Sequence, residues 1–205
     1  ANYFGITCSF ESGYTYVPDD NFEQALIDLG YDNYLDDYVY TSSIETVTAL
    51  NVSNKNISDL TGIEDFIALT DLYCHDNYLT TLDVSQNIAL NVLQCARNNL
   101  PSLDVSQNIA LNVLQCTSNN LTSLDVSQNT VLASLLCEHN LLTSLDVSQN
   151  TTLYNLYCSA NQLTSLDVSQ NTALEYLFCE NNNITTLDVS NNTALTSLSC
   201  RFNQL

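Results

Sequence analysis

Cysteine is the residue type in this chain with the most chemical potential, and seven of the eight cysteines recur at a fixed interval. Thiols in such a series can form disulfides, bind a metal ion or lie buried as small apolar groups. If each cysteine lies on one turn of a stacked repeat, neighbouring Cβ vectors run parallel, which is poor disulfide geometry, and each turn supplies only one metal ligand. We therefore expect a column of buried, unpaired thiols. The seven, each 21 residues from the next, are Cys74, Cys95, Cys116, Cys137, Cys158, Cys179 and Cys200.

Aspartate forms a second column with the same interval: Asp83, Asp104, Asp125, Asp146, Asp167 and Asp188. The Leu and Val on either side of each Asp should point inward, so the carboxylates should point outward, where Ser side chains such as Ser123 and Ser127 can donate hydrogen bonds to them. Calcium held between turns is the less favoured alternative, because hard cations accept stacked oxygen ligands. The weak calcium candidates are Asp104, Asp125 and Asp146, with a second group of Asp32, Asp36 and Asp37 that lacks the spaced, glycine-bearing loop of an EF-hand. We expect no cofactor.

The sequence shows little that resembles a catalytic site. The two histidines, His75 and His139, should occupy outward positions on the strand side three turns apart, roughly 15 Å. No serine lies in a nucleophile-elbow motif, and the zinc-protease pattern H-E-x-x-H does not occur. Glu138 beside His139 is the nearest approach to an acid–base pair, but neighbours along a strand face opposite ways. We expect the chain not to be an enzyme.

The charge balance excludes several classes of partner. The chain has 23 acidic residues against 3 basic ones, Lys55, Arg97 and Arg201. Nucleic-acid binding needs clustered Lys and Arg, so no nucleic acid is expected, and anionic membrane surfaces are disfavoured for the same reason. No run of about 18 apolar residues is present, so direct membrane insertion is not expected.

The repeat around these columns sets the architecture. Its unit reads L-x-x-L-x-C-x-x-N-x-L-x-x-L-D-V-S-x-N-x-x, and one copy runs from Leu111 to Val131. A period of 20 to 29 residues with this leucine spacing is the signature of a leucine-rich-repeat solenoid. We expect an α/β-class, mostly β fold with one short strand per unit through the Cys column, a parallel sheet on the concave face, and a short extended run at L-D-V-S. The Asn in the ninth position should turn inward and satisfy backbone groups of adjacent turns.

The chain divides into three parts. Residues 1–13 are a leader segment, and Cys8 within it could be free, cross-linked or lipidated, although Gly5-Ile6-Thr7-Cys8 is a poor lipidation signal. Residues 14–46 are an N-terminal cap with one helix, because Asp19 or Asp20 can cap the segment 21–30, Gly30 can end it, and Phe22, Ala25, Leu26 and Leu29 share one face. Residues 47–205 are the array, with one 22-residue and about seven 21-residue units, the last of them incomplete.

The outward strand positions vary from unit to unit and are the predicted binding surface. Leu136, Tyr157 and Phe178 occupy the same place in three successive units, and Tyr176 lies two residues before Phe178. Such an apolar, aromatic strip on an acidic protein favours a contact site, although aromatic residues also favour strands for their own sake. The predicted binding residues are Tyr73, Leu136, Glu138, Tyr157, Tyr176, Phe178 and Glu180.

Three segments carry a resemblance to known proteins. The stretch V-P-D-D-N-F-E-Q-A-L-I-D-L-G (17–30), the unit N-V-S-N-K-N-I-S-D-L-T-G-I-E-D-F (51–66) and the repeated L-T-S-L-D-V-S-Q-N-T resemble secreted leucine-rich-repeat proteins of Bacteroidetes-type bacteria. The cap and the first unit are also similar to those of internalins. The resemblance implies export to the cell surface or beyond, often with a C-terminal secretion domain. This chain departs from that pattern, since it stops at Leu205 within a repeat.

Three functions fit these features. The chain can be a binding module that engages a protein partner at the cell surface through the concave sheet. It can instead bind glycans or act as an adhesin, with Tyr157, Tyr176 and Phe178 stacking on sugar rings. It can also be a spacer or subunit in a surface assembly. The varied outward residues favour binding over spacing, and an extended sheet favours a protein over a small sugar.

Overall fold

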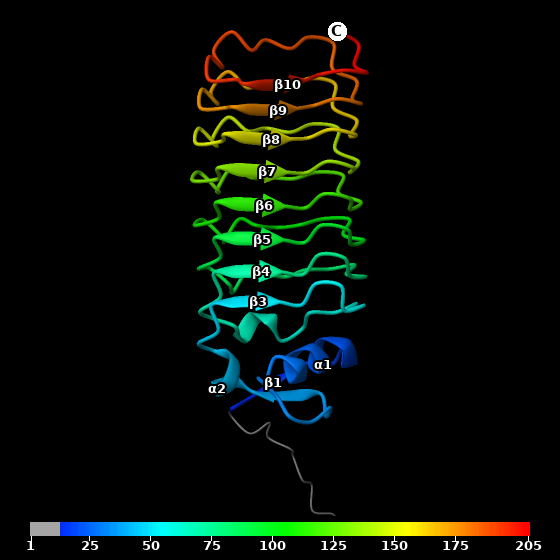
Figure 1. Ribbon diagram of the computed structural model, residues 1–205, viewed down its shortest axis with the longest axis vertical. Coiled ribbons are helices and arrows are strands. Elements are labelled where there is room, and N and C mark those ends of the chain that lie inside the picture. The colour runs from blue at the N-terminus through cyan, green and yellow to red at the C-terminus, as the bar shows by residue number, and fades with distance from the viewer. Residues whose placement is uncertain (1–12) are drawn as a thin grey trace, which may run out of the picture.

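The computed structural model describes residues 13–205, and these form a cap followed by a stack of short parallel strands (Figure 1). Residues 1–12, which include Cys8 and nearly all of the predicted leader, lie outside the described residues. One eight-stranded sheet runs along the stack, with its strands in chain order. The strands are β3 (Ala49–Asn51), β4 (Asp71–Tyr73), β5 (Val92–Gln94), β6 (Val113–Gln115), β7 (Ser134–Leu136), β8 (Asn155–Tyr157), β9 (Tyr176–Phe178) and β10 (Ser197–Ser199). The predicted leucine-rich-repeat solenoid with a parallel sheet is confirmed.

Each strand is three residues long, and from β3 to β9 its central leucine is fully buried. Leu114 in β6 is fully buried, and its neighbours Val113 and Gln115 are half-buried on the outside. Pairing is in register, so Leu93, Leu114 and Leu135 lie beside one another on successive strands. Cys116 follows as the next inward residue and is also fully buried. This alternation is what the period of two along a strand requires.

The chain returns on the opposite side of the stack without forming strands. In the central turn Leu121 and Val126 are fully buried and Leu124 is 7% exposed, so the three apolar residues carry the chain through the core as predicted. The extended run predicted at L-D-V-S does not pair as a strand anywhere in residues 13–205. We call the sheet side the strand face and the opposite side, which bears the Asp column, the return face.

The predicted role of the ninth-position asparagine is confirmed. The Asn119 side chain is buried, its Oδ1 accepts from the Leu100 N–H at 3.0 Å, and its Nδ2 donates to the carbonyls of Cys95 and Cys116 at 3.1 Å each. Each such amide pairs groups of two adjacent turns that would otherwise be buried without partners. Equivalent contacts are made by Asn77, Asn98, Asn140, Asn161, Asn182 and Asn203.

A second asparagine column joins neighbouring turns on the return side, as strand pairing joins them on the strand side. Asn129 is fully buried, and its Nδ2 donates to the carbonyls of Val105 and Asn108 on the preceding turn at 3.0 and 2.9 Å. These side-chain bonds replace the missing strand pairing on this side. The repeated asparagine is visible in the sequence unit, and its invariance among the units was the available signal for this role, which was not predicted. The column consists of Asn87, Asn108, Asn129, Asn150, Asn171 and Asn192.

The cap begins with β1 (Tyr14–Tyr16), continues through α1 (Asp20–Asp28) and closes with β2 (Tyr38–Tyr40) and the single-turn α2 (Thr41–Ile44). β1 and β2 pair antiparallel. Only one helix was predicted here; the structure adds α2 and this two-stranded sheet, whose three-residue strands are too short for a clear period-two signal. A 3-10 turn, η1 (Ile63–Asp65), lies in the first repeat.

Asp19 caps α1 and fastens it to the first repeat. Its Oδ1 accepts from the N–H groups of Asn21 and Phe22, and its Oδ2 accepts from the Ser58 N–H at 2.8 Å and hydroxyl at 2.7 Å. These donors lower the pKa of the Asp19 carboxyl although burial opposes them. Of the predicted helix face, Phe22, Ala25 and Leu26 are buried. Leu29 is 46% exposed, contrary to expectation, because α1 ends at Asp28 and Leu29 is its C-cap residue.

Candidate binding face

The aromatic residues predicted to form a strip come together at the C-terminal half of the strand face. Leu136, Tyr157 and Phe178 are register partners on β7, β8 and β9. The Tyr157 and Phe178 rings are 4.6 Å apart between centroids and tilted by 53°, a separation within the range of attractive aromatic pairs. All three side chains are half-buried, so one side of each remains open to solvent.

Tyr176 joins this strip but Tyr73 does not. Tyr176 begins β9 and lies close enough to Tyr157 to influence the ionisation of its phenol. Tyr73 lies on β4, and the strands between it and β7 present Gln94 and Gln115 at the same place. The structure therefore separates Tyr73 from the other predicted binding residues. It is a single aromatic on a polar stretch of the same face.

Tyr154 is a member of the strip that the sequence analysis missed. It precedes β8, is 41% exposed and acts electrostatically on Tyr157. Burial contributes most to the raised pKa of Tyr157, followed by the charge of Glu138 and then by Tyr176 and Tyr154. The signal was available, because Tyr154 is three residues before Tyr157, but Tyr154 precedes the strand, in a place that was not among the predicted outward positions. We define the aromatic strip as Leu136, Tyr154, Tyr157, Tyr176 and Phe178.

The two predicted rim carboxylates lie just beyond the ends of their strands. Glu138 follows Cys137, and its Oε2 accepts from the Thr117 hydroxyl of the preceding turn at 2.7 Å. Glu180 follows Cys179, and its Oε2 is shielded from solvent without a hydrogen-bond partner among the described residues. The two glutamates occupy equivalent places two turns apart. Ser159 occupies the same place on the turn between them.

The thiol column lies directly beneath this face. All seven cysteines of the column are free, and six of them are fully buried. Burial raises the pKa of Cys95 to about 12, and burial together with neighbouring thiols and Glu138 raises those of Cys116 and Cys137 well above the ordinary value. Cys200, on the last turn, is only half-buried, so the expectation of a fully buried column fails at that end. Leu198 on the same turn is 43% exposed.

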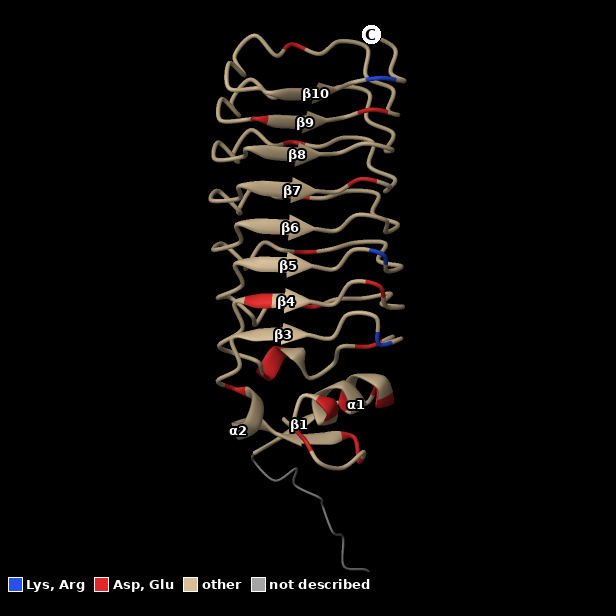
Figure 2. Ribbon diagram, viewed as in Figure 1, with Lys and Arg blue, Asp and Glu red and all other residues tan. Residues whose placement is uncertain are grey.

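The return face carries the predicted Asp column, and each carboxylate is used locally. Asp125 Oδ1 accepts from the N–H of Ser127 at 2.9 Å, and this bond lowers the pKa of the carboxyl. Asp83, Asp104, Asp146, Asp167 and Asp188 each accept from the Ser two residues later in the same way. Acidic residues are spread over both faces, and the few basic residues are far apart (Figure 2).

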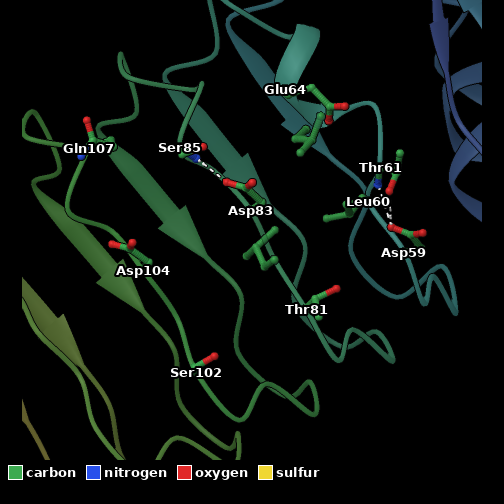
Figure 3. Close-up of a pocket in the computed structure, with 12 residues that line it drawn as sticks. Asp59, Leu60, Thr61, Glu64, Thr81, Asp83, Ser85, Ser102, Asp104 and Gln107 are labelled. Carbon is green, nitrogen blue, oxygen red and sulfur yellow. Dashed lines mark hydrogen bonds between the residues drawn. The ribbon is translucent and has the colours of Figure 1, made fainter.

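A groove of about 600 Å³ opens where the return face meets the first repeat. Asp59, Glu64, Asp83 and Asp104 line it together with small hydroxyl residues (Figure 3). Among residues 13–205, no group of three His, Cys, Asp or Glu side chains is arranged to hold a metal ion.

The other calcium candidates are also dispersed. Asp125 and Asp146 line two separate, smaller hollows further along the return face. In the cap, Asp32 is half-buried and Asp36 and Asp37 are exposed. Asp36 Oδ1 accepts from the N–H of Tyr38, which is a local turn contact. The arrangement of these carboxylates therefore gives calcium binding no further support.

The histidines are not brought together. His75 Nδ1 lies 2.8 Å from Asp76 Oδ2, and Arg97 approaches the other oxygen of Asp76 at 3.2 Å. His139 is exposed and has a left-handed backbone, with φ of 55°. It is aligned with Asp76 rather than with His75, because it is two residues after its cysteine and not one. His75 occupies the place directly after its cysteine, as Glu138 and Glu180 do, whereas His139 lies in the bend that follows β7.

No family model matches the chain. Among curated proteins, internalin J of Listeria monocytogenes is 40% identical over 83 residues, which is 40% of this chain and 9% of that protein. The solved functional domain of that internalin, described as including a cysteine ladder, has a TM-score of 0.77 at 40% identity and covers 93% of this chain and 48% of its own.

Two further structures share the architecture. The leucine-rich-repeat protein LIC12759 of Leptospira interrogans has a TM-score of 0.71 at 25% identity, over 79% of this chain and 45% of that one. Internalin C2 of Listeria monocytogenes, at 18% identity and a TM-score of 0.82 over 94% of this chain and 90% of its own, shows the fold alone. The chain spans less than half the length of the internalin J and Leptospira proteins. Over its described residues, the chain is a leucine-rich-repeat solenoid similar to the solved domain of internalin J.

Proposed function

We propose that this chain is a non-catalytic binding module that engages a protein partner through the strand face, at the outer cell surface or after secretion. The carrying observation is the aromatic strip: its five side chains gather on three neighbouring turns and remain partly open to solvent. Interface hot spots are enriched in aromatic residues. Solenoids use their long faces to bind extended partners.

The surface location is part of the proposal and rests on the resemblance to exported internalins and to the leucine-rich-repeat proteins of Bacteroidetes-type bacteria. Within residues 13–205 no helix is long and apolar enough to cross a membrane. The net charge of −20 argues against nucleic acid as the partner. A place as one subunit of a larger surface assembly is compatible with the same binding face.

Glycan binding is the second candidate. The Tyr157 and Phe178 rings are exposed on one side and could stack on sugar rings, with Tyr176 and Tyr154 beside them. We favour a protein because the strip continues onto the Leu136 side chain, an apolar surface that suits an apolar contact better than a hydroxyl-rich one. Glu138 and Glu180 at the rim add charge that a neutral sugar would leave unpaired.

The test is a comparison of partner capture by three proteins. The unchanged chain, the double variant Tyr157→Ala/Phe178→Ala and the control Asp125→Asn are immobilised and exposed to solubilised native cell-surface material and, separately, to a glycan array. A protein that is retained by the unchanged chain and by Asp125→Asn, but lost from the aromatic variant, supports the proposal. Retention of the same protein by all three overturns it, and array signals that depend on the aromatic pair move the assignment to glycans.

A further inference from the structure

A row of side chains next to the aromatic strip contains two polar atoms that the fold leaves without partners. The row is formed by the outward residue that follows the cysteine on each turn, and it runs Thr117, Glu138, Ser159, Glu180. Successive members belong to neighbouring turns, about 4.8 Å apart. The Ser159 Oγ and the Glu180 Oε2 are both shielded from solvent and have no hydrogen-bond partner among the described residues.

The start of the row shows what a satisfied pair in this position looks like. The Thr117 hydroxyl donates to Glu138 Oε2 at 2.7 Å, so neighbouring members of the row can reach each other. Ser159 is 8% exposed and lies between two glutamates, yet in this arrangement its hydroxyl bonds to neither. A carboxylate oxygen withdrawn from water without a donor is costly to bury. Ser159 Oγ and Glu180 Oε2 therefore lack hydrogen-bond partners within residues 13–205, and a donor group from outside the chain could supply them.

The aromatic pair forms the wall of this place. Tyr157 is two residues before Ser159 and Phe178 is two residues before Glu180, so ring, hydroxyl and carboxylate lie on the same side of the sheet. Glu138 is near enough to Tyr157 for its charge to be felt at the phenol. A cation here is attracted by the charge of the carboxylates and also by the negative face of the aromatic rings.

We infer that Glu138, Ser159 and Glu180, walled by Tyr157 and Phe178, form a subsite for one basic side chain, Lys or Arg, of a protein partner. The inference rests on the proposed function and adds the chemistry of the partner's central contact. An ammonium or guanidinium group placed over Ser159 can donate to carboxylates on both sides, and to the hydroxyl once the Ser159 side chain turns toward it, while its alkyl stem lies on the rings.

The charges of the chain fit this occupant better than the alternatives. The chain has 23 acidic and 3 basic residues, and within residues 13–205 Lys55 and Arg97 are paired with Asp28 and Asp76. Arg201, the next residue in the row beyond Glu180, makes no ion pair with any described residue within 4.0 Å. A metal ion is not favoured, because the described residues hold no three-ligand group. The surface therefore presents negative charge for which a basic partner is the complement.

The inference is tested by nuclear magnetic resonance titration of the isotope-labelled chain at physiological salt. The probes are N-acetyl-arginine amide and N-acetyl-lysine amide, with N-acetyl-glutamine amide as the neutral control. We expect saturable shifts at the Ser159 amide and the Tyr157 and Phe178 rings with at least one cationic probe and none with the neutral one. In Glu138→Gln/Glu180→Gln the dissociation constant should rise at least about tenfold, as expected when charge-assisted hydrogen bonds are lost.

The matched control is Asp125→Asn/Asp146→Asn, which removes the same charge from the return face and should change the dissociation constant less than about twofold. The subsite would be overturned if probe binding weakened equally in both double variants. It would also be overturned if the resonance shifts centred on the Asp column, or if the neutral probe bound as tightly as the cationic ones. If a captured protein partner depends on Tyr157 and Phe178 but is indifferent to Glu138→Gln/Glu180→Gln, the subsite fails and the proposed function stands. Folding of each variant is checked by circular dichroism, and Glu180→Asp gives a charge-preserving version.

Discussion

The two long faces of the solenoid are both exposed to solvent, yet one repeats itself and the other does not. On the return face every full turn from Asp83 onward presents the same Asp and bonds it to a backbone N–H two residues later. On the strand face the residue before the cysteine changes from Tyr73 through Gln94 and Leu136 to Ser199. The difference follows from what holds each side together.

Backbone pairing joins the turns on the strand side, so its outward side chains are not needed for the fold. On the return side no strands pair within the described residues, and the geometry depends on particular side chains: the Asp that bonds its own turn and the buried Asn that reaches the preceding one. Repetition here marks structural need, and variety marks positions that the fold leaves free.

The buried thiols between the two faces should show the largest effect. A thiol with a pKa of about 12, such as Cys95, has roughly a thousandfold less thiolate at pH 8 than one with the ordinary value of 9.0. Labelling of Cys95 in the native protein should be slower than in urea by at least that factor, followed by mass spectrometry of the peptides. Cys200, half-buried on the last turn, should react first. Uniform, fast labelling of all seven would contradict the buried column.

The raised thiol pKa values also make the stability of the fold depend on pH. The unfolded chain releases these protons near pH 9 while the folded chain retains them, so the free energy of unfolding should fall as pH rises above about 9. Thermal unfolding from pH 7 to 10 measures this. A Cys116→Ala variant should lose stability at pH 7 through its cavity but show a shallower fall above pH 9. An identical slope would assign the fall to other groups, such as tyrosines.

Removing one amide of the first asparagine column should cost about 3 kcal/mol or more. Asn119→Ala leaves the Leu100 N–H and one contact to each of the Cys95 and Cys116 carbonyls unpaired in the core. Urea unfolding measures the loss. Asn120→Ala is the matched control, because that neighbour is exposed, and it should change stability by less than about 0.5 kcal/mol. Equal effects at both positions would break the link between repetition and structural need.

On the strand face the expected pattern is reversed. Tyr157→Ala and Phe178→Ala should each weaken partner binding by about 30-fold, or about 2 kcal/mol, since both rings lie in the strip. Their cost to folding should stay near 1 kcal/mol, the scale of one aromatic pair. Surface plasmon resonance and thermal unfolding of the same samples separate the two quantities. A large loss of stability with unchanged affinity would make the strip structural.

The smallest effect belongs to a single turn of the return face. Asp125→Ala removes the acceptor of the Ser127 N–H and should lower the thermal midpoint slightly, with no change in partner affinity. Because that bond lowers the pKa of Asp125 below 3.8, its contribution is present above that value and is lost as pH falls through the folded pKa. The difference between Asp125→Ala and the unchanged chain should therefore shrink below about pH 4. A difference that persists at pH 2 would point to a cause other than the charge.

The repeat, the buried thiols and the inward Asn119 column were predictable because one inference serves every copy. The period fixes which side chains stack, and stacking fixes which are buried. The role of Asn129 was harder to foresee, because it depends on how the return segment curves and not on spacing alone. The cap was predicted only where a helix signal existed. Asp19 caps the helix and Phe22 is buried, as predicted, whereas the Tyr14–Tyr16 strand is too short to give a recognisable sequence pattern.

Individual residues of the candidate site were predicted, but the contacts between side chains of neighbouring turns were not. Tyr157 and Phe178 follow from their common place in the repeat. Ser159 does not, because its importance comes from neighbours one turn away in space. A hydroxyl is unremarkable in sequence, and only its burial between Glu138 and Glu180 distinguishes Ser159.

The first asparagine column has a direction. The Asn119 amide reaches only backward along the chain: to Leu100 and Cys95 on the turn before it and to Cys116 on its own. Asn77 does the same against Val52 and Ile57 of the first unit, which Asp19 ties to the cap. The backbone N–H groups run the other way: that of Cys116 donates to the carbonyl of Leu136, on the turn that follows. Each turn is therefore completed by its successor, and stability comes from adjacent turns together rather than from any one of them.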